Sequence, residues 1–158
     1  MYPNGLQSIV SLFESLPDQE KREALISYAD QAPKWRPKDA ESFDLEDVRK
    51  DEECTDTVGV FLKVDGDERV LFRVILGPQI QTLTKAMTSI LCRGLRDATV
   101  QEVLDVPADF VPKIVGGAFA LSGYEVVRAE RVSSRVVVER VANRLLRLRN
   151  VLIEGALV

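Results

Sequence analysis

The chain has 158 residues, of which 46% are hydrophobic and 29% are charged, and its formal net charge is −4. This length and composition fit one soluble globular domain, and no run approaches the ~20 consecutive apolar residues of a membrane span. Two cysteines and no histidine exclude a disulfide framework, Cys/His zinc sites and nucleophilic catalysis that relies on an imidazole base. Any chemistry must therefore use a thiol, carboxylates, lysine, tyrosine or groups supplied by a partner. The cysteine usage suits a reducing compartment, the cytoplasm or an organelle stroma or matrix, and the first residues lack the pattern of a targeting segment.

Two amphipathic helices joined by a tight turn are predicted at the start of the chain. Apolar residues recur at helical spacing over residues 6–15 and again over about 18–32. Pro17 and Asp18 between them are typical of one helix ending and the next beginning. Helices joined this closely pack as a hairpin, and Pro33 ends the second one.

The following connection, residues 33–53, shows little periodicity. A structureless connection of this length is uncommon in a compact domain unless it is functional or disordered. Trp35 and Phe43 are predicted to anchor it to the body of the protein, and a short helix is expected over 44–50.

A β-hairpin is predicted next, with strands over about 57–64 and 69–75. The turn Asp65-Gly66-Asp67 separates the two apolar runs, and Asp-Gly in this position is a strong hairpin signal. A DGD triplet also occurs in calcium loops, but the other ligand positions and the terminal glutamate of an EF-hand are missing. We therefore interpret the triplet as a turn and expect no metal site.

A longer amphipathic helix is predicted from Pro78 to about Leu95. Six apolar residues lie within about 140° of one another on its surface and form a core stripe: Ile80, Leu83, Met87, Ile90, Leu91 and Leu95. Cys92 lies on the flank of that stripe and is interpreted as a half-buried small apolar residue.

Two short helices are predicted after it. Thr99 and Glu102 have the spacing of a capping box, which starts a helix that runs through Leu104. Pro107 and Pro112 bracket a further helical turn.

The remaining region, 116–158, begins irregularly and then becomes helical. Glycines interrupt the pattern over 115–130, where residues 124–127 fit an edge strand, and a long helix is predicted from about Ser133. Residues 128–149 contain seven arginines and two acids, a local charge of +5 against −9 elsewhere. The simplest interpretation is a solvated helix face. An acidic partner surface comes second, and the acidic remainder of the chain disfavours nucleic acid.

The most unusual residue is Cys54, which lies in a charged connection immediately before an apolar strand. Free cysteines are usually buried, whereas such connections run over the surface. Four acids surround it in sequence, Asp51, Glu52, Glu53 and Asp56, and nearby negative charge disfavours a thiolate. The residues alone leave two interpretations open, an inert thiol and a nucleophile or sulfur carrier. The acids argue against an autonomous cysteine enzyme or redox sensor. They are compatible with a thiol that works only inside a partner's site and rests shielded from solvent.

Roughly residues 9–115 resemble the SufE family, the sulfur acceptors of cysteine desulfurases. The similarity begins with the helix pair FESLPDQEKREALISYADQAPKW and continues with the charged connection that carries Cys54 and the short-turn hairpin. It ends with the helix over 78–95 and the segment ATVQEVLDVPADFV. The chain resembles a divergent member of that family, since the family's glycine before the cysteine is Glu53 here. The family's C-x-S-x-V pattern becomes Cys54-Thr-Asp-Thr-Val58, and the C-terminal Ser-x-Arg motif is only loosely matched.

The resemblance implies a single α+β domain over 1–158, less typical over 116–158, in which a small antiparallel sheet packs against several helices. It also implies that Cys54 accepts persulfide sulfur from a SufS-like cysteine desulfurase, stimulates that enzyme, and passes the sulfur to an Fe–S scaffold. Such a protein is a sulfur carrier rather than an enzyme, with no cofactor, nucleic acid or membrane partner of its own. The alternative is a SufE-like binding or regulatory module that docks a partner without using Cys54. A stand-alone thiol enzyme is disfavoured by the missing histidine and the surrounding acids.

Overall fold

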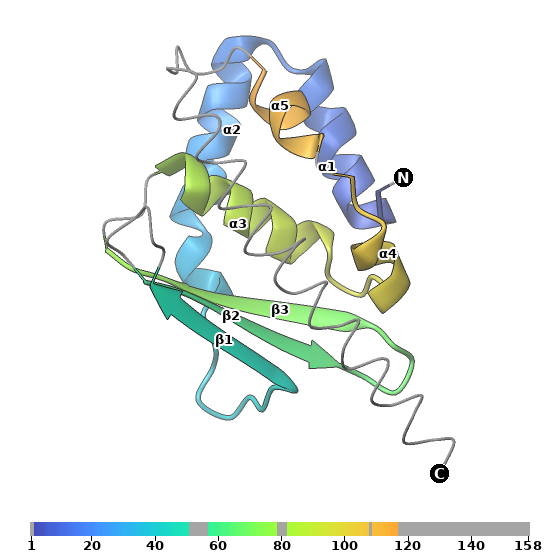
Figure 1. The fold of residues 1–158 in the computed structure, drawn as a ribbon. Coiled ribbons are helices and arrows are strands. Elements are labelled where there is room, and N and C mark those ends of the chain that lie inside the picture. Colours follow the sequence, from blue (N-terminus) through green and yellow to red (C-terminus); the bar gives the residue numbers. More distant parts are fainter. Residues whose placement is uncertain (1, 51–56, 79–81, 108, 117–158) are drawn as a thin grey trace.

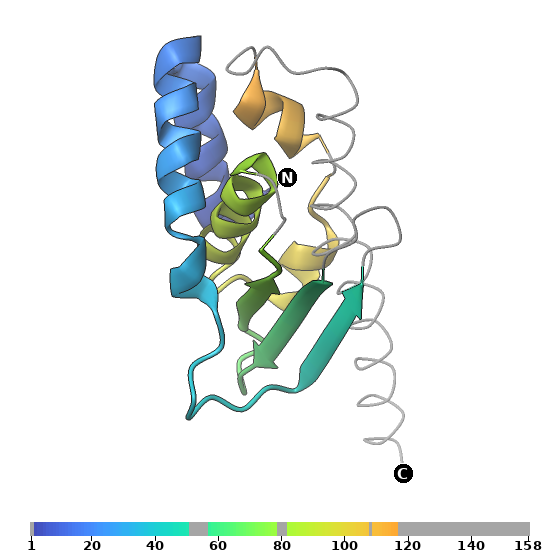
Figure 2. The same cartoon turned by 90° about the vertical axis from the view of Figure 1, so that its left-hand side faces the viewer.

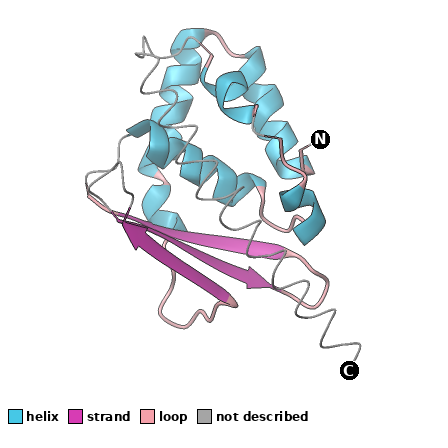
Figure 3. Cartoon of the chain, viewed as in Figure 1, coloured by secondary structure: helices cyan, strands magenta, loops and turns pink. Residues whose placement is uncertain are grey.

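The computed structural model describes residues 2–50, 57–78, 82–107 and 109–116. In these residues helices cover one face of a three-stranded antiparallel sheet, and α3 lies between the sheet and the outer helices (Figures 1 and 2). The predicted α+β fold is confirmed (Figure 3). In chain order the elements are α1 Asn4–Ser15, α2 Asp18–Asp30, the 3₁₀ helix η1 Ala32–Trp35, β1 Leu45–Lys50, β2 Thr57–Val64, β3 Val70–Leu76, α3 Thr82–Gly94, α4 Val100–Leu104 and α5 Phe110–Val115.

The predicted helix hairpin is confirmed. Helix α1 buries Leu6, Val10 and Phe13 at the expected spacing, and α2 begins directly after Pro17, which has extended backbone angles. Helix α2 ends at Asp30, slightly earlier than expected. The chain continues as the 3₁₀ helix η1. Pro33 is tolerated there because it lies in the first turn, where its missing N–H is not needed for a hydrogen bond.

The predicted β-hairpin is also confirmed. Strands β2 and β3 pair with Leu62 opposite Phe72 and Val60 opposite Val74, and these four side chains are buried beneath the helices. In the turn, the Asp65 carboxylate accepts hydrogen bonds from the backbone N–H groups of Asp67 and Arg69, both at 2.9 Å. The first aspartate of the DGD triplet therefore stabilises the turn.

The short helix expected over 44–50 is wrong, because this segment forms the edge strand β1. It pairs antiparallel with β2 from Leu45 opposite Leu62 to Lys50 opposite Thr57. Charged residues such as those of LEDVRK do not favour a strand by themselves. The unpaired backbone groups along β2 require hydrogen-bond partners, and this tertiary demand overrides the local preference. Charged side chains are common on edge strands because they discourage pairing with other chains.

Trp35 and Phe43 hold the connection between η1 and β1 against the body of the protein, as predicted. The Trp35 side chain packs against the core, and the Phe43 ring lies 5.4 Å from the Phe61 ring, measured between centroids. The Arg73 guanidinium lies 5.8 Å from the centroid of the Trp35 ring and pairs with Glu41 at 3.0 Å. The hydrogen bond from Arg73 lowers the pKa of Glu41 below its ordinary value.

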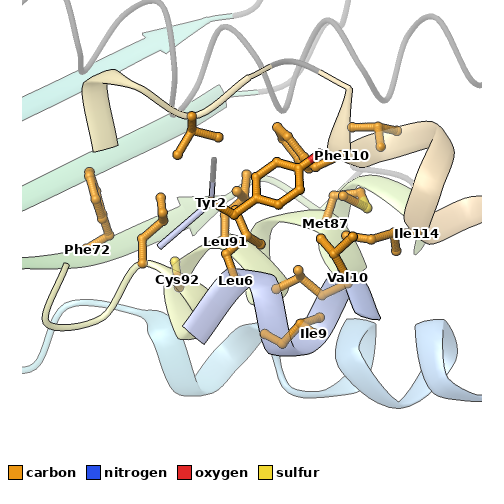
Figure 4. Packing of buried hydrophobic residues seen from close by; sticks show 14 of the residues in the cluster. Tyr2, Leu6, Ile9, Val10, Phe72, Met87, Leu91, Cys92, Phe110 and Ile114 are labelled. Carbon is orange, nitrogen blue, oxygen red and sulfur yellow. The ribbon is translucent and has the colours of Figure 1, made fainter. Parts of the chain in front are cut away.

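Helix α3 is the centre of the core. It packs against α1, α2, η1 and β3, so it is buried on several sides instead of along one stripe (Figure 4). Cys92 illustrates the difference, because it is fully buried rather than half-buried as expected, with 1% of its surface exposed.

The helices after α3 agree with their sequence signals. In α4 the capping box is complete, because the Glu102 N–H donates to Thr99 Oγ1 at 3.1 Å and the Thr99 N–H donates to Glu102 Oε1 at 3.3 Å. Helix α5 lies where a helical turn was expected but continues past Pro112, which is tolerated because it lies in the first turn. The edge strand predicted over 124–127, the helix from Ser133 and the arginine-rich 128–149 segment lie outside the described residues.

Candidate functional site

The register of the sheet places three features at one of its ends. Lys50, the last residue of β1, pairs with Thr57, the first residue of β2, and the next residue of β2, Val58, pairs with Leu76 at the end of β3. The connection 51–56 and the end of β3 therefore leave the sheet at the same end. Cys54 belongs to that connection, which lies outside the described residues, so the sequence prediction that its sulfur is shielded stays a prediction.

A pocket of about 370 Å³ opens at this end of the sheet. Its walls come from the end of α2, from η1 and Arg36, from the end of β3 with the two residues that follow it, and from the first half of α3. Most of the lining is apolar or small, and the charged lining residues are Asp30, Arg36 and Lys85. No pattern in the sequence predicts this pocket. Its lining residues come from two separate segments, 29–36 and 74–88, and no motif links them.

The second cysteine, Cys92, is buried and is not suited to act as a nucleophile. Figure 4 shows it among the buried side chains of the core, which also include Leu6 and Phe72. Burial raises the pKa of its thiol to about 12, and the positive charge of Arg73 offsets this only in part. A neutral thiol without solvent access is a poor nucleophile, so Cys92 serves as a small apolar core residue.

The raised pKa predicts a loss of stability at alkaline pH. An unfolded chain ionises this thiol near its ordinary value of 9.0, whereas the folded protein keeps the proton up to about 12. Above pH 9 the unfolded state therefore binds fewer protons, and the free energy of unfolding falls by up to about 1.4 kcal/mol for each pH unit. The stability that the buried, protonated thiol contributes is fully present below pH 9 and is lost as the pH rises toward 12.

Urea unfolding of the wild type and of Cys92→Ala between about pH 8 and 11 measures this effect. The wild type should lose roughly 2.5 kcal/mol more than the variant by the end of that range. The other titrating groups are common to both proteins and cancel in the difference. Parallel pH profiles would show that the thiol is accessible to solvent in the folded state.

The described residues contain neither a cluster of metal-binding side chains nor a helix that could span a membrane. Within them, no group of three or more cysteine, aspartate or glutamate side chains is arranged to hold a metal ion. In the same segments, no helix has the length and apolar character needed to cross a membrane.

Comparison with known proteins places the chain in one family. The model of the family "SufE: Fe-S metabolism associated domain" matches residues 7–122. Among solved structures, a solution structure of a hypothetical protein from Thermus thermophilus is similar, with a TM-score of 0.66 and 21% sequence identity over 93% of this chain and 97% of the other. This likeness concerns the fold. No curated protein matches the sequence significantly. The family match covers most of the chain, from within α1 through α2, the sheet and the whole of α3. The chain therefore belongs to the SufE family of Fe–S metabolism associated domains.

Proposed function

We propose that this protein accepts persulfide sulfur from a cysteine desulfurase on Cys54 and passes it to an Fe–S scaffold, and that it stimulates the desulfurase in doing so. Membership of the SufE family supports a role in Fe–S metabolism as a sulfur acceptor. A persulfide carrier of this kind works in a reducing compartment, such as the cytoplasm or an organelle stroma or matrix.

The burial of Cys92 is the observation that favours Cys54 as the sulfur acceptor. The chain has two cysteines, and Cys92 is fully buried with a pKa of about 12. A sulfur acceptor must reach the partner's persulfide, which Cys92 cannot do without unfolding the core. Cys54 is the remaining thiol. In the sequence it comes three residues before Thr57, the first residue of β2.

The proposed step is a thiol exchange in which atoms and electrons balance. The Cys54 thiolate attacks the outer sulfur of the desulfurase persulfide, and a new S–S bond forms on Cys54. The S–S bond of the desulfurase breaks, its cysteine leaves as a thiolate, and that thiolate takes up the proton that Cys54 gave up. No external oxidant or reductant is required, because the sulfane sulfur keeps its oxidation state.

The acids near Cys54 in the sequence would restrict its reaction to the complex with the partner. Glu53 and Asp56 lie within two residues of the thiol, and negative charge raises the free energy of the thiolate. The thiol is then poorly reactive in the free protein. It becomes a nucleophile where a partner supplies positive charge.

An intact-mass experiment tests the proposal. The protein is mixed with a cysteine desulfurase and cysteine without reductant, and the mass should increase by about one sulfur atom. Cys54→Ser should show no increase, whereas Cys92→Ala should behave like the wild type. A stable complex without any gain in mass would instead support a SufE-like regulatory module that binds the desulfurase without accepting sulfur.

A further inference from the structure

The pocket at the end of the sheet contains two cations that lack a carboxylate partner among the described residues. Arg36 is exposed directly after η1, and Lys85 is half-buried near the start of α3. The ion pairs of the described segments include Arg73–Glu41 and Lys113–Asp109. Within these segments neither Arg36 nor Lys85 forms one, although Asp30 lines the same pocket. Among the described lining residues the pocket therefore carries two positive charges against the one negative charge of Asp30.

The remaining walls suit an acidic side chain presented by a protein. Val74, Leu76 and Pro33 form apolar parts of the lining next to the two cations. Apolar walls lower the local dielectric and strengthen an ion pair formed beside them. A volume of about 370 Å³ lies at the small end of ligand pockets. It accommodates one or two side chains of a docked segment rather than a large cofactor.

The position of the pocket favours the desulfurase as the partner. It shares the sheet end with the connection 51–56, and a desulfurase that delivers sulfur to Cys54 must cover this end of the molecule. The whole chain carries a net charge of −4, so a partner's acidic group is favoured only where positive charge is concentrated locally.

We infer that the pocket formed by α2, η1, β3 and α3 is a docking site for an aspartate or glutamate side chain of the cysteine desulfurase, which pairs with Arg36 and Lys85. This inference rests on the proposed function. It adds to that function a contact which fixes the partner over the sheet end before sulfur is transferred.

Binding affinity with matched charge reversals tests the inference. The dissociation constant of the complex with the desulfurase is measured for the wild type, for R36E/K85E, and for the control K63E/R96E. Lys63 and Arg96 are exposed and lie near the other end of β2 and beyond the last turn of α3, away from the pocket, so the control makes the same change in net charge. We expect R36E/K85E to weaken binding roughly tenfold or more and to reduce its salt dependence. The control should stay within about threefold of the wild type.

Three results would overturn the inference. Equal weakening by both double variants would assign the effect to overall charge. Unchanged binding by R36E/K85E with an unchanged melting temperature would show that the pocket is not part of the interface. Saturable binding of inorganic phosphate or acetate, detected by amide shifts at Lys85 and Thr88, together with unchanged desulfurase affinity, would assign the pocket to a small free anion.

The intact-mass experiment separates this inference from the proposed function. At desulfurase concentrations above its weakened dissociation constant, R36E/K85E should still gain one sulfur, because Cys54 is untouched. If the wild type gains no sulfur but R36E/K85E still binds more weakly than the control, the sulfur-carrier function is wrong and the docking site stands. If the wild type gains sulfur and the two double variants bind alike, the docking site is wrong and the function stands.

Discussion

Replacing Cys54 with serine is expected to reduce the stimulation of the cysteine desulfurase to the level of the desulfurase alone. The hydroxyl of serine is not ionised at neutral pH and does not attack a persulfide, so sulfur uptake should fall on the order of a hundredfold or more, as when a nucleophile is removed. Alanine release from cysteine in the presence of a reductant measures the turnover, and the desulfurase without this protein sets the baseline.

The matched control for this prediction is the other thiol. Cys92→Ala removes a buried sulfur and costs some stability, but it should leave the stimulation unchanged at a temperature where the variant is folded. Stimulation that survives in Cys54→Ser and not in a variant with weakened docking would mean that the protein acts by binding alone. The alternative regulatory role would then replace the sulfur-carrier role.

Replacing Gly94 with valine is expected to cause a large loss of stability without touching Cys54. At the crossing of α1 and α3, a Cβ atom on Gly94 would lie 2.9 Å from the Cα of Leu6, and a Cβ on Gly5 would lie 2.7 Å from the carbonyl oxygen of Gly94. Both contacts involve backbone, which cannot move without separating the two helices. Overpacking of this kind should lower the free energy of unfolding by about 3 kcal/mol.

Gly66 provides the control for this substitution. It lies in the turn between β2 and β3, and a Cβ atom there would meet no atom within 4 Å. Gly66→Val should therefore stay within about 0.5 kcal/mol of the wild type in urea unfolding. A similar loss in both variants would show that the cost comes from removing glycine and not from the helix crossing.

The elements with a strong local signal could be predicted from the sequence. The helix hairpin followed from apolar spacing, the β-hairpin from Asp65-Gly66, and α4 from the capping box of Thr99. These features depend on residues within a few positions of one another, so a single segment contains the whole signal.

The features that depend on distant contacts could not be predicted in this way. Strand β1 is a strand because β2 needs a hydrogen-bond partner, and the residues 45–50 carry little strand pattern of their own. Cys92 was placed at the flank of one apolar stripe, but α1, α2, η1 and β3 all pack on α3, so the flank is buried as well. The depth of burial of a helix that is covered on several sides is not visible in its own periodicity.

The candidate site was predictable only in part. Cys54 stood out because a thiol in an acidic connection is unusual, but the residues alone left its role open, and the carrier role came from the family resemblance. The pocket with Arg36 and Lys85 was missed. Its two cations come from segments about 50 residues apart, and only the fold brings them to one sheet end.

The most direct test of the account locates the transferred sulfur on the chain. After reaction with the desulfurase and cysteine, the protein is alkylated, digested with trypsin without reduction and analysed by tandem mass spectrometry. Cleavage after lysine and arginine places the two cysteines in separate peptides, Cys54 in 51–63 and Cys92 in 86–93. The account predicts one additional sulfur atom in the peptide 51–63 and none in 86–93. Additional sulfur in 86–93, or in neither peptide while the desulfurase is fully charged with persulfide, would contradict it.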